Sequence, residues 1–470
     1  MKRLTKIFFI FLFPLFVSGQ YHTFRHNLNE QFSDSFLDTS ISISKTTQYF
    51  NISPKIFSLS SLSNTNEYYN TYLLGLTFNS NINNRLKAVA SYDYLNGDYN
   101  SIINNYQDSL SIYYPGFGLN NNRFQFNVKY LANKFITLDL GHAKQFIGDG
   151  YQSLLLSNIA SSYPYLKITT EFGPVRYYNL YTTFINPNMV DYGRKKHATI
   201  HFLDFSITNK IHFGIFESIL WQSKLEGFNN GYELSYLNPV IFYRPVEFSK
   251  QSNKGNALMG ANFNLEFKNA IFYAQFILDD LNISRQKDVD ENYGKGFFQN
   301  KYGYQLGLKG KKDDVNYLIE YNQVQPYTYG HRTILQNYSH MNQALAHPLG
   351  ANFKELITVF GIKKGKWNYN IKTMIANIGL DSIDTHYGQN IFESDYEASN
   401  GGQYSYGNFN GQGIITTILV FNPEISFRLK DFDLFGSIYY RTKKSDVLDQ
   451  TLIFYSIGFR TFPFAFFNGY

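Results

Sequence analysis

The chain has 470 residues and no cysteine, which excludes a disulfide-stapled fold and a lipid-modified N-terminal cysteine. Its 40 Tyr and 45 Phe bring the aromatic fraction to 19%, yet the mean hydropathy is −0.30. That combination is typical of strands with one lipid face, aromatic girdles and a polar interior. The net charge of +6 falls to +3 without Lys2, Arg3 and Lys6, so charge indicates no nucleic-acid partner.

The N-terminal residues have the pattern of an export signal. Lys2, Arg3 and Lys6 precede an apolar run from Ile7 to Val17, and the small residues Ser18 and Gly19 follow. The run is about half of the roughly 20 residues that a membrane-spanning helix needs. We therefore predict a signal peptide over residues 1–19. Residues 20–50 are polar and mixed, and we interpret them as a periplasmic or plug segment.

From residue 51 to residue 470 the sequence predicts one outer-membrane β-barrel. Apolar and polar residues alternate in runs near the 9 to 11 residues that a tilted membrane strand needs. About eighteen strands are expected, an even number as in bacterial single-chain barrels. The run 198–208 changes phase between Phe202 and Leu203, which predicts a bulge. The clearest runs are 52–60, 71–78, 85–94, 123–130, 136–141, 166–172, 175–184, 261–267, 270–279, 355–362, 367–376, 415–429, 432–441 and 452–462.

The stretch 301–322 has the pattern of a hairpin. Tyr302, Tyr304, Leu306 and Leu308 share one face, and the short charged turn 310–314 leads into a second two-faced run. A soluble sandwich would bury the apolar face, whereas a membrane barrel turns it toward lipid. In the barrel interpretation, Gln305, Lys309, Asn316 and Glu320 face the interior.

Connection lengths decide between these folds because they alternate. Short turns are expected at 81–84, 133–134, 173–174, 209–210, 268–269, 310–314, 364–366 and 430–431. Long connections are expected at 95–122, 145–164, 185–197, 222–257, 280–301, 323–354, 377–413 and 442–451. Short periplasmic turns and long extracellular loops are the topology of an outer-membrane barrel. A Greek-key sandwich has no reason to keep that order.

No hydrolase, phosphate-binding or zinc-protease motif is present, so we predict neither an enzyme nor a cofactor. His331, His340 and His347 share one long connection, but their spacing matches no ligand pattern. The acidic run 288–292 could bind a cation, although an acidic loop tip explains it as well. We predict no metal site.

The most distinctive local pattern spans residues 141–168 and contains Gly148, Gly150, Ser153, Ser157, Asn158 and Pro164. Further ordered motifs contain Asn238, Pro239, Glu247, Asn256, Pro348 and Gly350. In these motifs the chain resembles the capsule assembly Wzi family, to which a gliding-motility protein, RemB, is also similar. The resemblance covers about half of the barrel. It implies a partly plugged barrel of eighteen strands that anchors or organises capsular or extracellular polysaccharide. The family has an N-terminal helical bundle, for which residues 21–50 are too short.

Polar and aromatic loop residues are the candidate glycan contacts, because aromatic faces stack on sugar rings and polar groups bond the hydroxyls. The candidates are Tyr113, Tyr114, Asp149, Arg244, Asp279, Asp280, Tyr404 and Tyr406. The expected location is the outer membrane of a Gram-negative bacterium, with the loops at the cell surface. The expected partners are outer-membrane lipid, a surface polysaccharide and the barrel-assembly machinery. The alternatives are a gliding-motility or adhesion protein and a diffusion porin.

Overall fold

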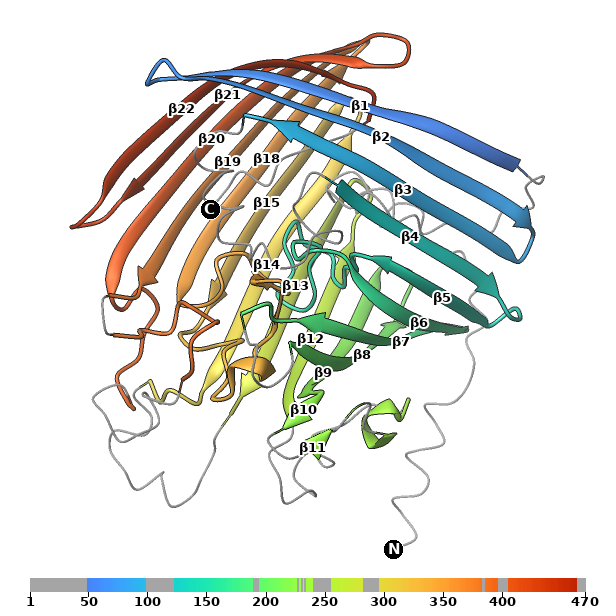
Figure 1. Ribbon diagram of the computed structural model, residues 1–470, viewed down its shortest axis with the longest axis vertical. Coiled ribbons are helices and arrows are strands. Elements are labelled where there is room, and N and C mark those ends of the chain that lie inside the picture. Colours follow the sequence, from blue (N-terminus) through green and yellow to red (C-terminus); the bar gives the residue numbers. More distant parts are fainter. Residues whose placement is uncertain are drawn as a thin grey trace, which may run out of the picture.

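Eighteen strands form one closed antiparallel β-barrel (Figure 1). The computed structural model describes residues 49–98, 122–188, 194–225, 228–229, 231, 234–239, 255–281, 296–382, 385–395 and 405–462. Each barrel strand pairs with its neighbours along the chain, and β1 also pairs with β22 from Phe57↔Arg460 to Ser63↔Phe454. The predicted fold and strand number are confirmed. Residues 1–48, which hold the expected signal and most of the expected plug segment, lie outside the described residues.

The barrel strands differ in length from 8 to 16 residues. They are β1 (Tyr49–Ser63), β2 (Tyr68–Asn83), β3 (Leu86–Gly97), β4 (Asn122–Leu131), β5 (Ile136–Ala143), β6 (Tyr163–Phe172), β7 (Val175–Ile185), β8 (Lys195–Ser206), β9 (Ile211–Gln222), β12 (Gly255–Glu266), β13 (Ala270–Asp280), β14 (Lys301–Lys312), β15 (Val315–Val324), β18 (Phe353–Lys364), β19 (Trp367–Leu380), β20 (Ile414–Arg428), β21 (Asp433–Lys444) and β22 (Asp449–Arg460).

Short elements lie in the connections between these strands. Two small hairpins are β10 (Lys224–Leu225) with β11 (Phe228–Asn229), and β16 (Ser339–His340) with β17 (Gln343–Ala344). The 3₁₀ helices described are η2 (Leu234–Leu237) and η3 (Ile334–Gln336). Among the residues that the structure describes, no helix is long and apolar enough to cross a membrane.

The outer face of the barrel is apolar, as predicted from the hairpin 301–322. Leu306 on β14 is 45% exposed, while its neighbour Gln305 is fully buried in the interior. Leu308 and Ile319 also point outward, and Lys309 and Glu320 point inward. In water each such exposed leucine or isoleucine would forgo about 1.5–3 kcal/mol of burial, a loss that contact with lipid removes.

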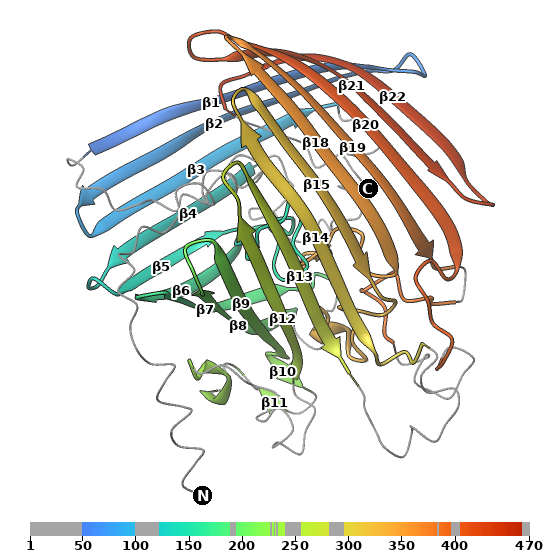
Figure 2. The same ribbon diagram turned by 180° about the vertical axis from the view of Figure 1, so that it is seen from behind.

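Short and long connections lie at opposite ends, which we name the turn end and the loop end (Figure 2). The turn end carries the tight turns, such as 313–314 between β14 and β15. The loop end carries long connections, such as 325–352 between β15 and β18. One predicted long connection is wrong. Residues 445–448 join β21 to β22 in a tight turn, because those strands extend further than the alternating pattern indicated.

The predicted bulge at Phe202 and Leu203 is also wrong. The pairing of β8 with β7 and with β9 runs through both residues without a shift. Phe202 points into the barrel, where its ring occupies the space beside Gly214; a Cβ at that glycine would lie 2.4 Å from the ring. The apolar–polar alternation of this strand looks shifted in the sequence because Phe202 is an apolar residue on the inner face. Register shifts occur instead at Asn81/Asn83 and at Leu278/Asp280.

The middle of the barrel interior is filled rather than open. Residues 144–162, which connect β5 to β6, lie inside the ring of strands in both views (Figures 1 and 2). Leu154, Leu155 and Leu156 in this connection are buried in one hydrophobic cluster with inward-facing wall residues such as Phe216 and Leu258. Tyr329 and Leu345 from 325–352 belong to the same cluster. We name the connections 144–162 and 325–352 together the plug.

Candidate functional site

Two glycines let the first plug connection approach the wall closely. A Cβ at Gly148 would lie 1.9 Å from Nε2 of Gln275, and Gly148 also has a φ of +138°. A Cβ at Gly150 would lie 2.4 Å from Oε1 of Gln305. Side chains would not fit at either position, because wall side chains already occupy that space. Gly148 and Gly150, which belong to the motif found in the sequence, therefore allow this connection to lie against the inner wall.

Inward-facing polar side chains of β13 to β15 hold the plug backbone. Glu320 accepts hydrogen bonds from the backbone N–H groups of Tyr151, at 2.6 Å, and Gln152, at 3.1 Å. Gln275 accepts from the N–H of Leu154 at 2.9 Å, and Gln305 donates to the carbonyl of Gln152 at 3.0 Å. Buried backbone groups need such partners, since an unpaired one costs about 1–3 kcal/mol. The wall thus satisfies the plug's irregular backbone.

The second plug connection packs on the first. Tyr329 and Tyr338 donate to the carbonyls of Leu154 and Leu155, each at 2.8 Å. The amide of Ser157 donates to the carbonyl of Leu345 at 2.7 Å. Burial raises the pKa of both tyrosine hydroxyls, so they remain protonated donors. The two connections therefore close the lumen as a single packed unit.

An inward-facing lysine fixes the second connection to the wall. Lys196 on β8 is fully buried and donates to the carbonyl of Asn337 at 2.6 Å, to its side-chain oxygen at 2.7 Å and to Ser339 Oγ at 3.0 Å. Three oxygens occupy the three donor positions of one ammonium group. This arrangement anchors the plug from β8, which only β9 and β12 separate from β13 in the wall.

A charged cluster lies where β13 and β14 reach the loop end. Lys301 pairs with Asp395 at 2.5 Å, and Asp279 accepts a hydrogen bond from the amide of Tyr329 at 2.7 Å. Burial opposes ionisation of Asp395, but the charge and hydrogen bond of Lys301, together with the charges of His331 and His386, outweigh it and lower the pKa of Asp395. The cluster joins the barrel wall to the plug and to the connection 381–395.

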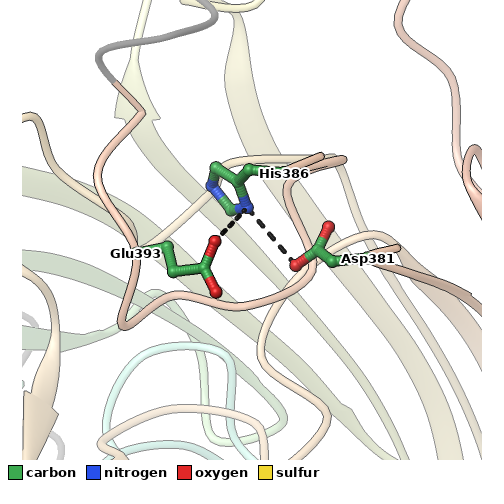
Figure 3. A group of neighbouring side chains, drawn as sticks. All are labelled: Asp381, His386 and Glu393. Carbon is green, nitrogen blue, oxygen red and sulfur yellow. Dashed lines mark hydrogen bonds and ion pairs between the residues drawn. The ribbon is translucent and has the colours of Figure 1, made fainter. Parts of the chain in front are cut away.

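A histidine and two carboxylates meet in the connection after β19 (Figure 3). His386 Nδ1 lies 3.3 Å from Asp381 Oδ2 and 3.7 Å from Glu393 Oε2. Asp381 also accepts from the backbone amides of Tyr387 and Asn390. Burial works against ionisation of Asp381, yet the bonds from His386 and the two amides lower its pKa. Because protein donors already use this carboxylate, we assign the group to holding the connection's shape.

An aromatic and amide surface forms at the loop end between 296–300 and 405–413. The rings of Phe297 and Tyr406 lie 5.4 Å apart, and Phe298 lies 5.1 Å from Phe297. Asn408 holds the two segments together through Gly296, whose carbonyl accepts from the Asn408 amide at 3.0 Å and from its side chain at 2.9 Å. Phe409 beside it is 60% exposed. Phe297 and Phe298 are buried beneath these residues. We name Tyr406, Asn408 and Phe409 the loop-end aromatic surface.

The predicted glycan contacts are not gathered in one place. Asp149 lies in the plug, where its carboxylate accepts from Asn262 at 2.8 Å and its carbonyl accepts from Lys309. Asp279 and Asp280 end β13 beside the charged cluster, and Asp279 is buried. Tyr406 alone of the described candidates belongs to the loop-end aromatic surface. Tyr113, Tyr114, Arg244 and Tyr404 lie outside the described residues.

Most of the motif residues lie in or against the plug. Ser153 and Ser157 each form a hydrogen bond within it, to Ile147 and Ala346, and Asn256 donates to the carbonyl of Gln336 at 2.9 Å. Gly350 has a φ of +73° beside Gln389. The other motif residues lie in the plug (Asn158, Pro348), in β6 (Pro164), in the segment after η2 (Asn238, Pro239) or outside the described residues (Glu247).

The three histidines of the connection 325–352 have separate partners. His347 Nε2 lies 2.8 Å from Glu355, His340 bonds to Ser162 and Ile185, and His331 bonds to Thr333. The structure therefore does not bring them together as ligands. The acidic run 288–292 lies outside the described residues.

Part of the outer wall is covered by η2 and the two residues after it, which we name the covering segment (234–239). Sequence analysis did not predict this cover. The hydroxyls of Tyr177 and Tyr181 on β7 donate to the carbonyls of Pro239, at 2.5 Å, and Leu237, at 3.1 Å. His201 and Glu217, which are register partners, lie on this outer face and are nevertheless buried. Charged groups on a lipid-facing surface are costly, so this part of the wall requires cover. The sequence did contain an indication of this cover, because His201 and Glu217 interrupt the apolar outer faces of their strands.

Comparisons with known proteins find similarity in the fold. No family model matches the chain, and no curated protein matches its sequence. The structure is similar to Wzi of Escherichia coli, described as an outer membrane protein involved in group 1 capsule assembly and a carbohydrate binding β-barrel. The identity is 14% and the TM-score 0.55, over 88% of this chain and 85% of that chain. The chain has an outer-membrane β-barrel fold.

A second group of similar structures consists of Pseudomonas aeruginosa barrels. The structure of OprD is 10% identical with a TM-score of 0.46, over 87% of this chain and 94% of that chain. OpdK, solved with vanillate, is 8% identical with a TM-score of 0.45, over 87% and 98%.

Sequence analysis missed the residues that hold the plug. Glu320, Gln305 and Lys309 were predicted to face the interior, but their partners are 153 to 169 residues away in the chain. A cluster of polar residues facing inward from adjacent strands β13 to β15 was the available signal. Its meaning depends on which connection enters the barrel, and that requires the three-dimensional structure.

Proposed function

We propose that this barrel binds a capsular or extracellular polysaccharide at the cell surface and acts without catalysis. The observation that supports it most is the plug, which fills the barrel interior at mid-height through contacts with β8 and with β13 to β15. A diffusion channel needs a continuous aqueous path, and a packed hydrophobic cluster opposes one. Loops above a closed barrel are suited to holding a surface ligand.

In this proposal the polysaccharide contacts the loop-end aromatic surface. Tyr406 and Phe409 supply ring faces for sugar rings. The side chain of Gln412 donates to the side-chain oxygen of Asn408 at 2.8 Å, a bond that fixes the segment carrying these rings. Tyr113, Tyr114, Arg244 and Tyr404 remain candidate contacts in this proposal. Asp149 and Asp279 would act indirectly, by fixing the plug and the wall beneath. The fold similarity to a carbohydrate-binding barrel is in keeping with this function.

The test is retention of polysaccharide by cells that produce the double variant Tyr406→Ala and Phe409→Ala. We expect the variant to release polysaccharide into the medium while reaching the outer membrane in normal amount. The matched control is Val447→Ala, which removes an apolar side chain that is 75% exposed at the same end of the barrel. Unchanged retention and unchanged binding of purified polysaccharide by the double variant would contradict the proposal.

A further inference from the structure

A groove of about 970 Å³ lies on the outer face of β4 to β7. The pairing register places its outward-facing lining residues in two rows across the four strands. The first row contains Phe126, His142, Pro164 and Thr183, and the second contains Leu140, Leu166 and Tyr181. All of these side chains alternate with inward-facing residues such as Asp139 and Lys167. The groove therefore lies on the outside of the barrel and meets the plug only at the loop end, at Ser162, His340 and Met341.

The groove exists because small residues lie between raised edges. Pro164 and Thr183 form its low middle. One edge is Tyr181 with Leu237 of the covering segment, which its hydroxyl bonds at 3.1 Å. The other is the pair Phe124 and Phe126, whose rings lie 5.7 Å apart. At the loop end, Met341 closes the groove, with its amide bonded to the carbonyl of Ile185 at 2.7 Å.

Polarity changes along the groove. Toward the barrel's middle it opens onto the lipid-facing band, where Leu140 is 57% exposed. At the loop end its lining includes Lys195, which is exposed and follows Arg194. An occupant that fits both ends has a long apolar chain and a negatively charged head. The volume is within the roughly 300–1,000 Å³ typical of sites for small molecules.

We propose that this groove binds an acyl chain of a phosphorylated glycolipid from the outer leaflet, with a head-group phosphate at Lys195. This proposal shares one assumption with the proposed function, namely that the loop end faces the outside of the cell. An exposed lysine in the interface favours anionic over zwitterionic heads. The groove gives the chain contact with its middle and with both raised edges.

The absence of cysteine allows a clean test in vesicles. Leu166→Cys places a bimane fluorophore in the groove, and Ile375→Cys places one on the open outer face of β19 as the control. The proteins are reconstituted in brominated phosphatidylcholine, whose acyl chains quench bimane. Unbrominated lipid A is then added at a few mole per cent. Heat-modifiable migration on a gel confirms that each variant is folded.

We expect lipid A to relieve quenching at residue 166 several-fold more than its mole fraction predicts, and at residue 375 only in proportion. Lys195→Glu in the Leu166→Cys background should reduce this excess. Equal relief at both positions would overturn the proposal. So would equal relief by lipid A and unbrominated phosphatidylcholine at residue 166. Because no polysaccharide is present, the outcome is independent of the proposed sugar-binding function.

Discussion

Glu320 on β15 accepts a 2.6 Å hydrogen bond from the backbone amide of Tyr151, which lies 169 residues earlier in the chain. The same carboxylate accepts from Gln152 and from the hydroxyl of Tyr273, the latter at 2.7 Å. One inward-facing side chain of the wall therefore satisfies two plug amides. We expect docking of the plug to depend on this contact.

Glu320→Ala should weaken docking of the plug without unfolding the barrel. Each donor left unsatisfied costs about 1–3 kcal/mol, a penalty that favours undocking of the plug into water. We expect larger and more frequent conductance events in planar bilayers. Glu424→Ala is the control, since that lumen-facing carboxylate pairs with Arg460 at 2.5 Å. If the variant and the wild type showed the same conductance events, hydrophobic packing alone would be sufficient to hold the plug in place.

Tyr329→Phe and Tyr338→Phe should each increase plug fluctuations. Each change removes a hydroxyl that donates to a plug carbonyl, for a loss of about 1 kcal/mol, or roughly fivefold faster opening. Hydrogen exchange of residues 147–157 measures this directly. Tyr439→Phe, on β21, controls for loss of a buried tyrosine hydroxyl elsewhere. Exchange that matches this control in both variants would contradict the assigned role.

Acid should release the hairpin 339–344. His340 is buried, and burial lowers its pKa to about 3, so the folded form is neutral. Its stabilising contribution is complete above the unfolded value near 6.5. It declines as the pH falls below 6.5 toward 3, because the unfolded segment then binds the extra proton. At pH 5 the loss is about 2 kcal/mol.

The measurement for His340 is hydrogen exchange of residues 339–344 between pH 7.5 and pH 5, corrected for intrinsic rates. His340→Gln is the matched variant, because an amide can accept from the Ile185 amide and donate to the Ser162 carbonyl without titrating. We expect the variant to lose most of the pH dependence. Parallel curves for the two proteins would assign the effect to another group.

A nitroxide at Leu306 should report lipid, whereas one at Gln305 should displace the plug. Leu306 faces outward, but Gln305 donates to the carbonyl of Gln152 at 3.0 Å and has no room for a larger group. Continuous-wave spectra with oxygen and a nickel chelate as relaxants distinguish lipid from water. High nickel accessibility at residue 306 would mean that β14 is assigned the wrong face.

The sequence was sufficient to predict the wall, because alternation in a run such as 301–322 is a local property. Alternation separated Leu306 from Gln305, and the alternating connection lengths then assigned them to the outer and inner faces. Phe202 was misread, since an inward-facing aromatic residue over Gly214 looks like a shift in phase. Rules for strands assume a polar lumen, and this lumen is partly hydrophobic.

The plug was beyond such reasoning, because its contacts link distant residues. The motif with Gly148 and Gly150 was recognised, but residues 145–164 were interpreted as a structured extracellular loop. Only the position of Gln275 and Gln305 against these glycines explains them. Likewise, nothing in the separate strands β8 and β13 to β15 indicates that they hold the plug.

The distance in sequence between Tyr151 and Glu320 has a consequence for biogenesis. The first plug connection, 144–162, belongs to the early strands, while its anchors belong to β13, β14 and β15, which are translated much later. Closing so long a segment is slow relative to forming neighbouring hairpins. The connection 144–162 can therefore dock only after β13 to β15 are in place, and we expect the lumen to be filled late in assembly.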